Sequence, residues 1–207
     1  MTVYDEERIS QRCAQNGEKK TVFLIGDSIR MGYCETVRHE LADVAQVIYP
    51  EENCRFSQHI LVRLRAWAGL CDPEQVNLVH FNCGHWDAAH WNGDEASLNS
   101  LEEYHKNICR IIASLRRIFP NARILFATST PMNPNGVNSP NPRTTQEMMA
   151  FNAAGLAAAQ ECGVEVNDLF AYTKDWDESA YRDYAHFTPE AFEKLGKHVA
   201  DVLRAAL

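Results

Sequence analysis

Two short segments near opposite ends of the chain contain the side chains that acyl-transfer chemistry requires. Ser28 lies in the segment 26–29, Gly-Asp-Ser-Ile, directly after an apolar run and at the start of a helical pattern. A serine hydroxyl is a weak nucleophile until a base within hydrogen-bond reach takes its proton. Asp183 and His186 lie three residues apart. A carboxylate that holds one imidazole nitrogen leaves the other able to act as that base. The spacing therefore predicts a Ser28–His186–Asp183 triad.

Each segment also has a simpler structural explanation when it is taken alone. Ser28 could cap the N-terminus of the helix that follows it, because serine is common at that position. Asp183 and His186 could be solvated side chains of a surface loop. The combination of the two segments favours catalysis, since the backbone N–H groups of a helix N-terminus beside Ser28 can also stabilise an oxyanion.

Together the two segments resemble the first and last sequence blocks of the SGNH/GDSL hydrolase family. The first block is Gly26-Asp27-Ser28-Ile29, and the last is Asp183-Tyr184-Ala185-His186 followed by Phe187-Thr188-Pro189. The resemblance extends from about residue 21 to the last predicted helix. It implies that Ser28 is the nucleophile, that His186 is the general base and then the general acid, and that Asp183 orients His186. It also implies that the reaction needs no cofactor.

The middle of the chain departs from the family pattern. The family places a glycine after the second strand, where its N–H points into the oxyanion hole, and Cys54 occupies that position here. A backbone N–H survives this change, and Asn53 could add a side-chain donor. The family's next block offers an Asn side chain that is absent from the segment 82–87, Asn-Cys-Gly-His-Trp-Asp. The resemblance therefore implies an oxyanion hole of Ser28 and Cys54, with Asn82 as a substitute donor.

Several residues beside these blocks are candidate substrate contacts. They are Asp27, Arg30, Asn53, Gly84, Trp86 and Asp87. Trp86 and Trp91 could form an aromatic rim that faces sugars or acyl chains, although a partly buried tryptophan is more often part of a core. His85, Asp87 and His90 could together bind zinc, but the chain has no helix-spaced His-Glu-x-x-His motif, and we expect no metal.

Strand-like and helical patterns alternate along the chain, and this alternation predicts the fold that must position these residues. Apolar runs predict strands at 21–26, 44–49, 77–82, 122–130 and 164–169, and amphipathic patterns predict helices at 29–41, 57–70, 98–119, 145–162 and 189–206. Such alternation is typical of an α/β fold with a five-stranded parallel sheet. The family resemblance implies the three-layer, flavodoxin-like α/β/α form.

One edge of that sheet should gather the candidate site. In open parallel sheets, ligands bind at the carboxyl ends of the strands. This rule places the turn at Ser28, the segment after Tyr49, the segment after Phe81 and the loop after Thr130 on one rim. The loop 131–142 is rich in Pro, Asn and Gly and is long for a compact domain, so we expect it to be a binding loop.

Composition limits the classes of partner and compartment. The 207 residues suit a single domain, 1–207, with a core from about 21 and a polar extension over 1–20. The net charge of −8 disfavours nucleic acid, and no apolar run is long enough to span a membrane. The seven cysteines form no CxxC pair, and no signal peptide precedes the core, so we expect free thiols and a cytoplasmic location.

The sequence thus predicts a serine esterase that acts on a small-molecule or carbohydrate ester. Three identities remain open within this class: a carbohydrate esterase that removes acetyl groups, a short-chain lipolytic esterase or thioesterase, and an acyltransferase. A non-catalytic binding module on the same fold is the alternative from another class. The aromatic segment after the third strand favours the carbohydrate esterase. Nothing in the sequence indicates an oligomeric state.

Overall fold

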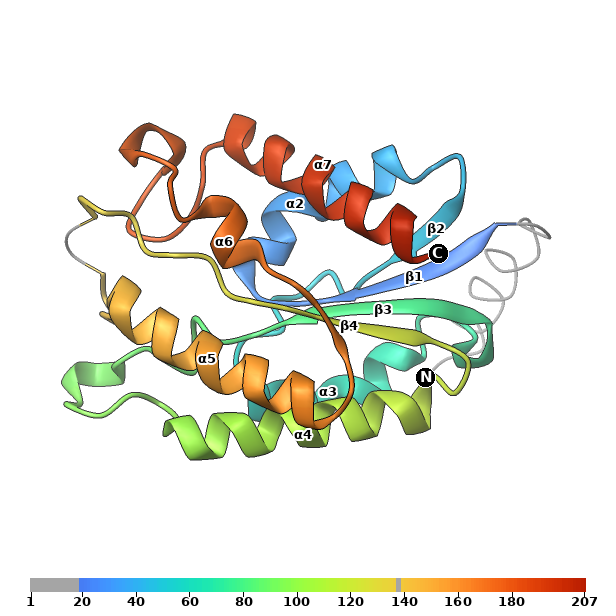
Figure 1. Cartoon of the computed structure of the whole chain (residues 1–207), viewed down its shortest axis with the longest axis horizontal. Helices are drawn as coiled ribbons and strands as arrows, with labels where there is room; N and C mark the ends of the chain where they lie inside the picture. The colour runs from blue at the N-terminus through green and yellow to red at the C-terminus, as the bar shows by residue number, and fades with distance from the viewer. Residues whose placement is uncertain (1–18, 137–138) are drawn as a thin grey trace.

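The computed structural model describes residues 19–136 and 139–207 (Figure 1). The expected extension over 1–20 therefore lies outside the described residues, apart from its last two positions. Five strands form one sheet: β1 (Lys20–Ile25), β2 (Ala45–Ile48), β3 (Val76–Asn82), β4 (Arg123–Ala127) and β5 (Glu165–Asn167). All neighbouring pairs are parallel, and the strand order is β2-β1-β3-β4-β5. This order is that of the flavodoxin-like fold, so the predicted fold class is confirmed.

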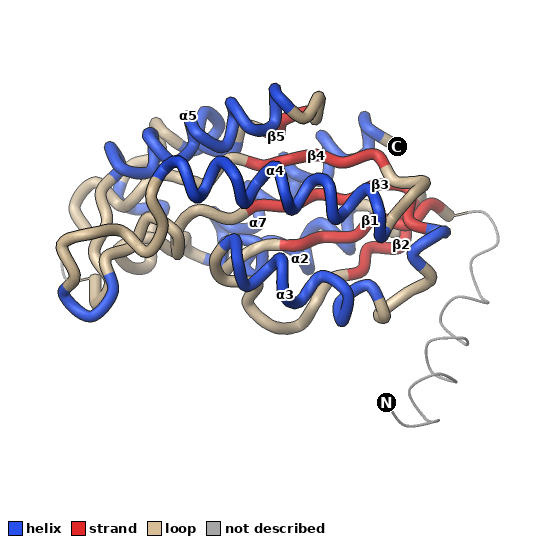
Figure 2. The backbone as a smooth tube through the Cα atoms, turned by 90° about the horizontal axis from the view of Figure 1, so that it is seen from below, coloured by secondary structure: helices blue, strands red, loops and turns tan. Residues whose placement is uncertain are grey.

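Helices cover both faces of the sheet. They are α2 (Ser28–Glu40), α3 (Ser57–Ala68), α4 (Leu101–Ile118), α5 (Thr145–Glu161), α6 (Leu169–Thr173) and α7 (Pro189–Ala206), with 3₁₀ turns at Pro73–Gln75, Trp91–Gly93 and Glu178–Ala180. Helices α2 and α7 pack together on one face, with α6 beside them (Figure 1). Helices α3, α4 and α5 cover the other face, which is turned toward the viewer in Figure 2.

The alternation of side chains along β1 explains why both faces need a helical layer. Val22 and Leu24 point into the core beneath α2 and α7, whereas Phe23 and Ile25 point into the core beneath α3 and α4. All four side chains have no exposed surface. A strand that is apolar at every position must be covered on both sides, which is the arrangement of a central strand in an α/β sheet.

Two predicted boundaries differ from the structure for a local reason. The predicted strand 122–130 ends at Ala127, because the next residues turn their polar groups to loops instead of continuing the sheet. The Thr128 hydroxyl donates to the Asp168 carboxylate at 2.8 Å. The helix predicted from 98 begins at Leu101, where Ser100 and Glu103 form a capping box. Helix α6, which was not predicted, begins at Leu169 behind the cap Asp168.

The carboxyl ends of the strands meet at one edge, where four segments far apart in the sequence lie together. They are the turn 26–28 after β1, the segment 83–91 after β3, the residues 128–136 and 139–144 after β4, and the loop 181–188 before α7. None of the helices in the described parts of the chain is both long enough and apolar enough to cross a bilayer.

Candidate active site

Ser28 is the first residue of α2 and does not cap it. The cap is Asp27, whose carboxylate accepts the Ile29 N–H at 3.0 Å. This arrangement leaves the Ser28 hydroxyl free of a capping role and places the Ser28 N–H in the first turn, where backbone N–H groups have no partner within the helix. The N-terminal end of α2 therefore supplies both a hydroxyl and a positive dipole end at one point.

The structure brings Ser28, His186 and Asp183 into one chain of hydrogen bonds. The Ser28 Oγ lies 2.8 Å from His186 Nε2. On the other side of the ring, His186 Nδ1 lies 3.0 and 2.9 Å from the two oxygens of Asp183. The His186 and Asp183 side chains keep 18% and 35% of their surface exposed, so solvent and substrate can reach them. The Asp183 carboxylate fixes the tautomer in which Nε2 can accept the Ser28 proton.

The loop before α7 holds Asp183 in its ionised form. Burial on its own would raise the pKa of Asp183. The N–H groups of Ala185 and His186, which donate to its carboxylate at 2.9 and 2.8 Å, outweigh that effect. Together with the imidazole, they lower the pKa below its ordinary value. The Arg182 N–H donates to the His186 carbonyl at 2.8 Å and closes the loop.

The two other expected oxyanion donors are committed elsewhere. The Cys54 N–H donates to the Gly26 carbonyl at 3.0 Å, which ties the segment after β2 to the turn before Ser28. The Asn82 amide donates to the Asp27 carboxylate at 3.3 Å, and Asn82 is 1% exposed. The single hydrogen of the Cys54 N–H is taken by the Gly26 carbonyl, which disagrees with the expectation that this group faces an oxyanion. The Asn82 amide keeps a second N–H on an almost completely buried side chain, so its role as an oxyanion donor stays a prediction. Of the three expected donors, the Ser28 N–H fits the role.

Three of the expected substrate contacts are buried in supporting positions. Asp27 has no exposed surface, and burial raises the pKa of its carboxyl although Ile29 and Asn82 donate to it. Arg30 is 1% exposed and donates to the Glu52 carbonyl at 2.7 Å. Gly84 has a φ of +143°, and a Cβ there would lie 2.4 Å from the Ser129 hydroxyl. The burial of the Asp27 and Arg30 side chains disagrees with the expectation that they touch substrate, whereas a substrate contact of Gly84 stays a prediction.

Asp87 is also buried, and it caps α3 from a distant part of the chain. The helix's own cap position, Phe56, offers no side-chain acceptor. Asp87 instead accepts the Ser57 N–H at 3.1 Å, the Ser57 hydroxyl at 2.5 Å and the Asn99 amide at 2.7 Å. Burial raises the pKa of Asp87 to about 6 despite these donors. Asp87 therefore stabilises the fold and is not exposed to substrate, contrary to the expectation.

Trp86 and Trp91 form the expected aromatic pair at the rim. Their ring centroids lie 4.9 Å apart, and both side chains are half-buried. The Arg55 guanidinium lies 5.8 Å from the centroid of the Trp86 ring, and Arg55 itself has a φ of +57°. Asn53 accepts the Arg55 N–H at 2.8 Å and so supports this bend of the chain. Trp86 and Asn53 remain predicted substrate contacts.

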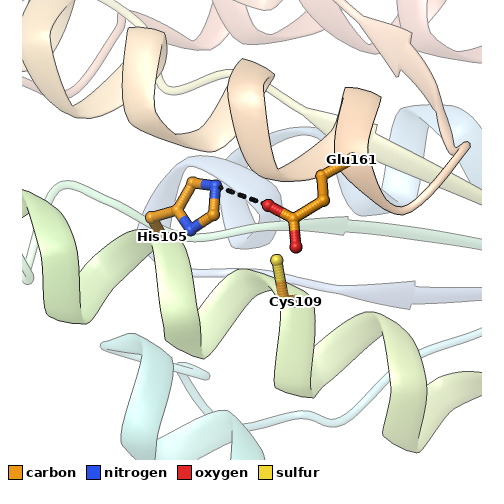
Figure 3. Close-up of side chains that lie close together, drawn as sticks. All are labelled: His105, Cys109 and Glu161. Atoms are coloured by element: carbon orange, nitrogen blue, oxygen red, sulfur yellow. Dashed lines mark ion pairs between the residues drawn. The ribbon is translucent and has the colours of Figure 1, made fainter.

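The three residues that could have bound zinc are not brought together. His85 contacts Thr130, Asp87 caps α3, and His90 lies 2.7 Å from the Glu147 carboxylate. Within residues 19–136 and 139–207, one other group could hold a metal ion. It consists of His105 and Cys109 on α4 and Glu161 at the end of α5, with ligand atoms within 4.8 Å of one another (Figure 3). Helix α5 extends about 24 Å from its start at the rim to this group.

The structure also places residues at the rim that the sequence analysis did not single out. Asn133 donates through its amide to the Asp183 carbonyl and through its N–H to the Tyr184 carbonyl, both at 3.0 Å. Arg143 lies with its guanidinium 5.6 Å from the centre of the Tyr184 ring. Both belong to the segment that begins with the predicted binding loop 131–142. The loop was recognised from its composition, but no local pattern indicates which of its side chains turn inward.

A pocket of about 480 Å³ opens beside Ser28 between α2 and the start of α7. Its lining residues are Ser28, Met31, Gly32, Thr36, Arg182, His186, Phe187, Pro189, Phe192 and Glu193. Gly32 lets the two helices approach closely, because a Cβ there would lie 2.3 Å from the Phe192 ring. The pocket therefore places apolar surface next to the nucleophile on one side of the triad.

Comparison with known proteins places the chain in a family of acylhydrolases. The sequence model of the GDSL-like lipase/acylhydrolase family matches residues 24–194. A GDSL esterase/lipase of Arabidopsis thaliana is 25% identical over 173 residues, which cover 80% of this chain and 55% of that protein. The chain thus spans about half the length of that relative.

Two solved structures share the fold over nearly their whole length. The lipase/acylhydrolase from Enterococcus faecalis superposes with a TM-score of 0.70 at 16% identity. The superposition covers 90% of this chain and 96% of the Enterococcus faecalis chain. Est24, a carbohydrate acetylesterase from Sinorhizobium meliloti, superposes with a TM-score of 0.69 at 15% identity. The superposition covers 91% of this chain and 100% of the Est24 chain. At these identities the likeness establishes the fold alone.

Proposed function

Because the chain belongs to the GDSL-like lipase/acylhydrolase family, we propose that it is a serine esterase in which Ser28, His186 and Asp183 cleave acyl esters. The observation that carries this proposal is the contact of 2.8 Å between Ser28 Oγ and His186 Nε2, with Asp183 on the opposite ring nitrogen. A nucleophile, a base and the group that orients the base are the parts that acyl transfer requires.

In the first half of the proposed reaction, Ser28 Oγ attacks the ester carbonyl carbon while His186 Nε2 takes the hydroxyl proton. The carbonyl oxygen becomes an oxyanion, and the Ser28 N–H at the N-terminus of α2 stabilises it. Asp183 stabilises the imidazolium that forms. The tetrahedral intermediate collapses when His186 returns the proton to the leaving alcohol, which leaves the acyl group on Ser28.

In the second half, a water molecule replaces the alcohol. His186 takes a proton from the water as its oxygen attacks the acyl carbon, and a second oxyanion forms at the same position. Collapse of this intermediate breaks the bond to Ser28 Oγ, which regains its proton from His186. The carboxylic acid then leaves. The cycle restores the starting protonation state and consumes only ester and water.

We further propose an acetylated carbohydrate as the substrate, in preference to a long-chain lipid. Support comes from the half-buried Trp86–Trp91 pair at the rim, because aromatic faces suit the apolar faces of sugar rings. Among proteins of the same fold, Est24 is a carbohydrate acetylesterase. Lipolytic, thioesterase and acyltransferase activities are the competing identities.

We also propose that the chain, 1–207, is one domain with its core from about residue 21, and that the protein works in a reducing, cytoplasmic compartment. The single sheet with both layers of helices supports the first point. The second is supported by five cysteines of the described part of the chain that are free thiols, namely Cys34, Cys54, Cys83, Cys109 and Cys162.

Labelling with a fluorophosphonate probe tests the proposed nucleophile. We expect the wild-type protein to form a covalent adduct, detected as a mass increase by intact-protein mass spectrometry, and to hydrolyse 4-nitrophenyl acetate. Ser28→Ala should do neither, whereas Ser114→Ala on α4 should do both. A wild-type protein that neither labels nor cleaves esters would instead indicate a binding module on this fold.

A further inference from the structure

Arg143 is a cation held at the rim by residues from three different segments. Its Nε donates to His85 Nδ1 at 3.3 Å, and its Nη1 donates to the Asn141 carbonyl at 3.1 Å. Its guanidinium lies 5.6 Å from the centre of the Tyr184 ring, two positions before His186 in the chain. Arg143 therefore bridges the segment after β3 and the loop that contains the catalytic base.

The Arg143 side chain is partly buried without forming an ion pair. Among the described residues, no carboxylate oxygen lies within 4.0 Å of its guanidinium. Asp27 and Asp183 attract it only at longer range, and both are engaged by other donors. A partly desolvated cation without a counter-charge is unfavourable unless something else supplies the negative charge. Most surface arginines lie free in water, whereas this one is held against neutral groups.

His85 fixes the direction of the guanidinium. Its Nε2 lies 3.1 Å from the Thr130 hydroxyl, so the hydrogen-bond network assigns the proton to Nε2 and leaves Nδ1 to accept from Arg143. Burial, Arg143 and His186 together hold the pKa of His85 well below its usual range. His85 therefore stays neutral at ordinary pH and does not compete with Arg143 for an anion. It is a positioning residue for the cation.

We propose that Arg143 binds a carboxylate of the substrate, so that the preferred esters are those of acidic molecules, such as an acidic sugar or a dicarboxylic half-ester. The planar guanidinium matches a carboxylate, with which it can form two parallel hydrogen bonds. This inference rests on the proposed esterase function, and it names the substrate class of the same site. It also explains how a chain of net charge −8 could accept an anionic substrate, because Arg143 supplies a positive charge at the rim.

A purely structural role for Arg143 is the competing explanation. Arg143 lies in the field of Asp27 and Asp183, and its charge could simply stabilise those carboxylates. The two roles differ in what a substitution changes. Loss of a structural cation would affect neutral and charged substrates alike, whereas loss of a carboxylate-binding group would affect only the charged ones.

Matched pairs of esters separate these roles. For the alcohol side, we would compare 4-acetoxybenzoate with its methyl ester, and for the acyl side, 4-nitrophenyl hemisuccinate with 4-nitrophenyl butyrate. Each pair gives a ratio of kcat/KM, charged over neutral. In at least one pair we expect Arg143→Met to lower the ratio about tenfold or more, and Arg143→Lys to lower it less. Arg117→Met, which removes an exposed charge at the end of α4, should leave both ratios unchanged.

Three outcomes decide the proposal. A ratio that falls in Arg143→Met and partly recovers in Arg143→Lys supports it and identifies the side of the ester that carries the charge. Hydrolysis of the neutral esters by the wild type, with both ratios unchanged in the variants, overturns it and leaves the esterase function intact. If the wild type cleaves no ester at all, the proposed esterase function is wrong, and the anion site is then tested by binding. Calorimetry should show that 4-hydroxybenzoate binds the wild type at least about tenfold more tightly than methyl 4-hydroxybenzoate does. Arg143→Met should abolish this difference. Equal binding of the two compounds would overturn it.

Discussion

Two groups of polar residues lie at the same edge of the sheet and behave in opposite ways. In the triad segments, 26–28 and 183–186, the polar atoms of Ser28, His186 and Asp183 face one another and stay partly exposed. In the supporting segments, 52–57 and 82–87, Asn82 and Asp87 turn inward and are almost fully buried. Being next to the site therefore does not give a side chain a role in the chemistry.

The difference follows from which neighbouring groups lack a partner. The first N–H of α3 has no acceptor of its own, and Asp87 supplies one. The Asp27 carboxylate is buried behind the nucleophile, and Asn82 donates to it. A buried donor or acceptor without a partner costs about 1–3 kcal/mol, so nearby polar side chains turn toward such groups first. Ser28 and His186 have no comparable demand on them and remain available to a substrate.

Replacing Ser28 by Ala should produce the largest effect in either group. We expect kcat/KM for 4-nitrophenyl acetate to fall by at least about 10⁵-fold, because no other group can form the acyl-enzyme. The midpoint of thermal unfolding should stay close to that of the wild type, since Asp27 and not Ser28 caps α2. A stability loss without an activity loss would reverse the assignment and return Ser28 to a structural role.

Asp183→Asn should have the next largest effect, with a loss of about 10⁴-fold in kcat near neutral pH. The amide can no longer hold the His186 tautomer that accepts the Ser28 proton.

The lowered pKa of Asp183 also determines the direction in which the stability of the protein changes with pH. The stability that this group contributes is present above its ordinary pKa near 4 and is lost as the pH falls through the lower folded value. Urea titrations of the wild type and Asp183→Asn from pH 2 to pH 7 measure this difference.

Asp87→Ala should reduce stability and spare the chemistry. It removes the acceptor of the Ser57 N–H, the Ser57 hydroxyl and the Asn99 amide, so we expect the free energy of unfolding to fall by about 3 kcal/mol. Well below its unfolding temperature, kcat/KM for 4-nitrophenyl acetate should change by less than about threefold. Asp175→Ala, in an exposed loop, serves as the control. A large loss of activity at unchanged stability would restore Asp87 as a substrate contact.

The raised pKa of Asp87 adds a pH signature to the same group. A carboxyl whose pKa rises from 3.8 to about 6 on folding favours the folded state most below pH 3.8, and this contribution is lost as the pH rises to about 6. The shift corresponds to about 3 kcal/mol. The stability difference between the wild type and Asp87→Asn should therefore decline from pH 4 to pH 6.5 and then level off. A difference that is constant with pH would contradict the buried environment of Asp87.

The sequence predicted the fold and the triad segments for the same reason. Strand and helix periodicities are local patterns, and Ser28 and the Asp183–His186 loop are each defined by a few adjacent residues at element boundaries. The inward turn of Asp87 depends on a contact with Ser57, thirty positions away in the chain, and Arg143 reaches His85 over fifty-eight positions. No single-sequence pattern encodes which distant N–H will lack an acceptor. The supporting residues could therefore be located at the rim but not assigned a direction.

The smallest expected effect is also the sharpest test of the comparison, because it concerns Asn82, the residue whose two roles differ most. If the Asn82 amide faced the oxyanion, its removal in Asn82→Ala would lower kcat by about 10²–10³-fold. The structure commits it to Asp27, so we expect kcat to fall by less than about tenfold. The free energy of unfolding should fall by about 1–2 kcal/mol, because the buried Asp27 carboxylate loses a donor.

Stopped-flow acylation with 4-nitrophenyl acetate, compared with urea unfolding of the same Asn82→Ala variant, separates the two roles. A loss confined to acylation would mean that Asn82 turns toward the substrate during the reaction and belongs with the triad, while a loss confined to stability would keep it among the supporting residues.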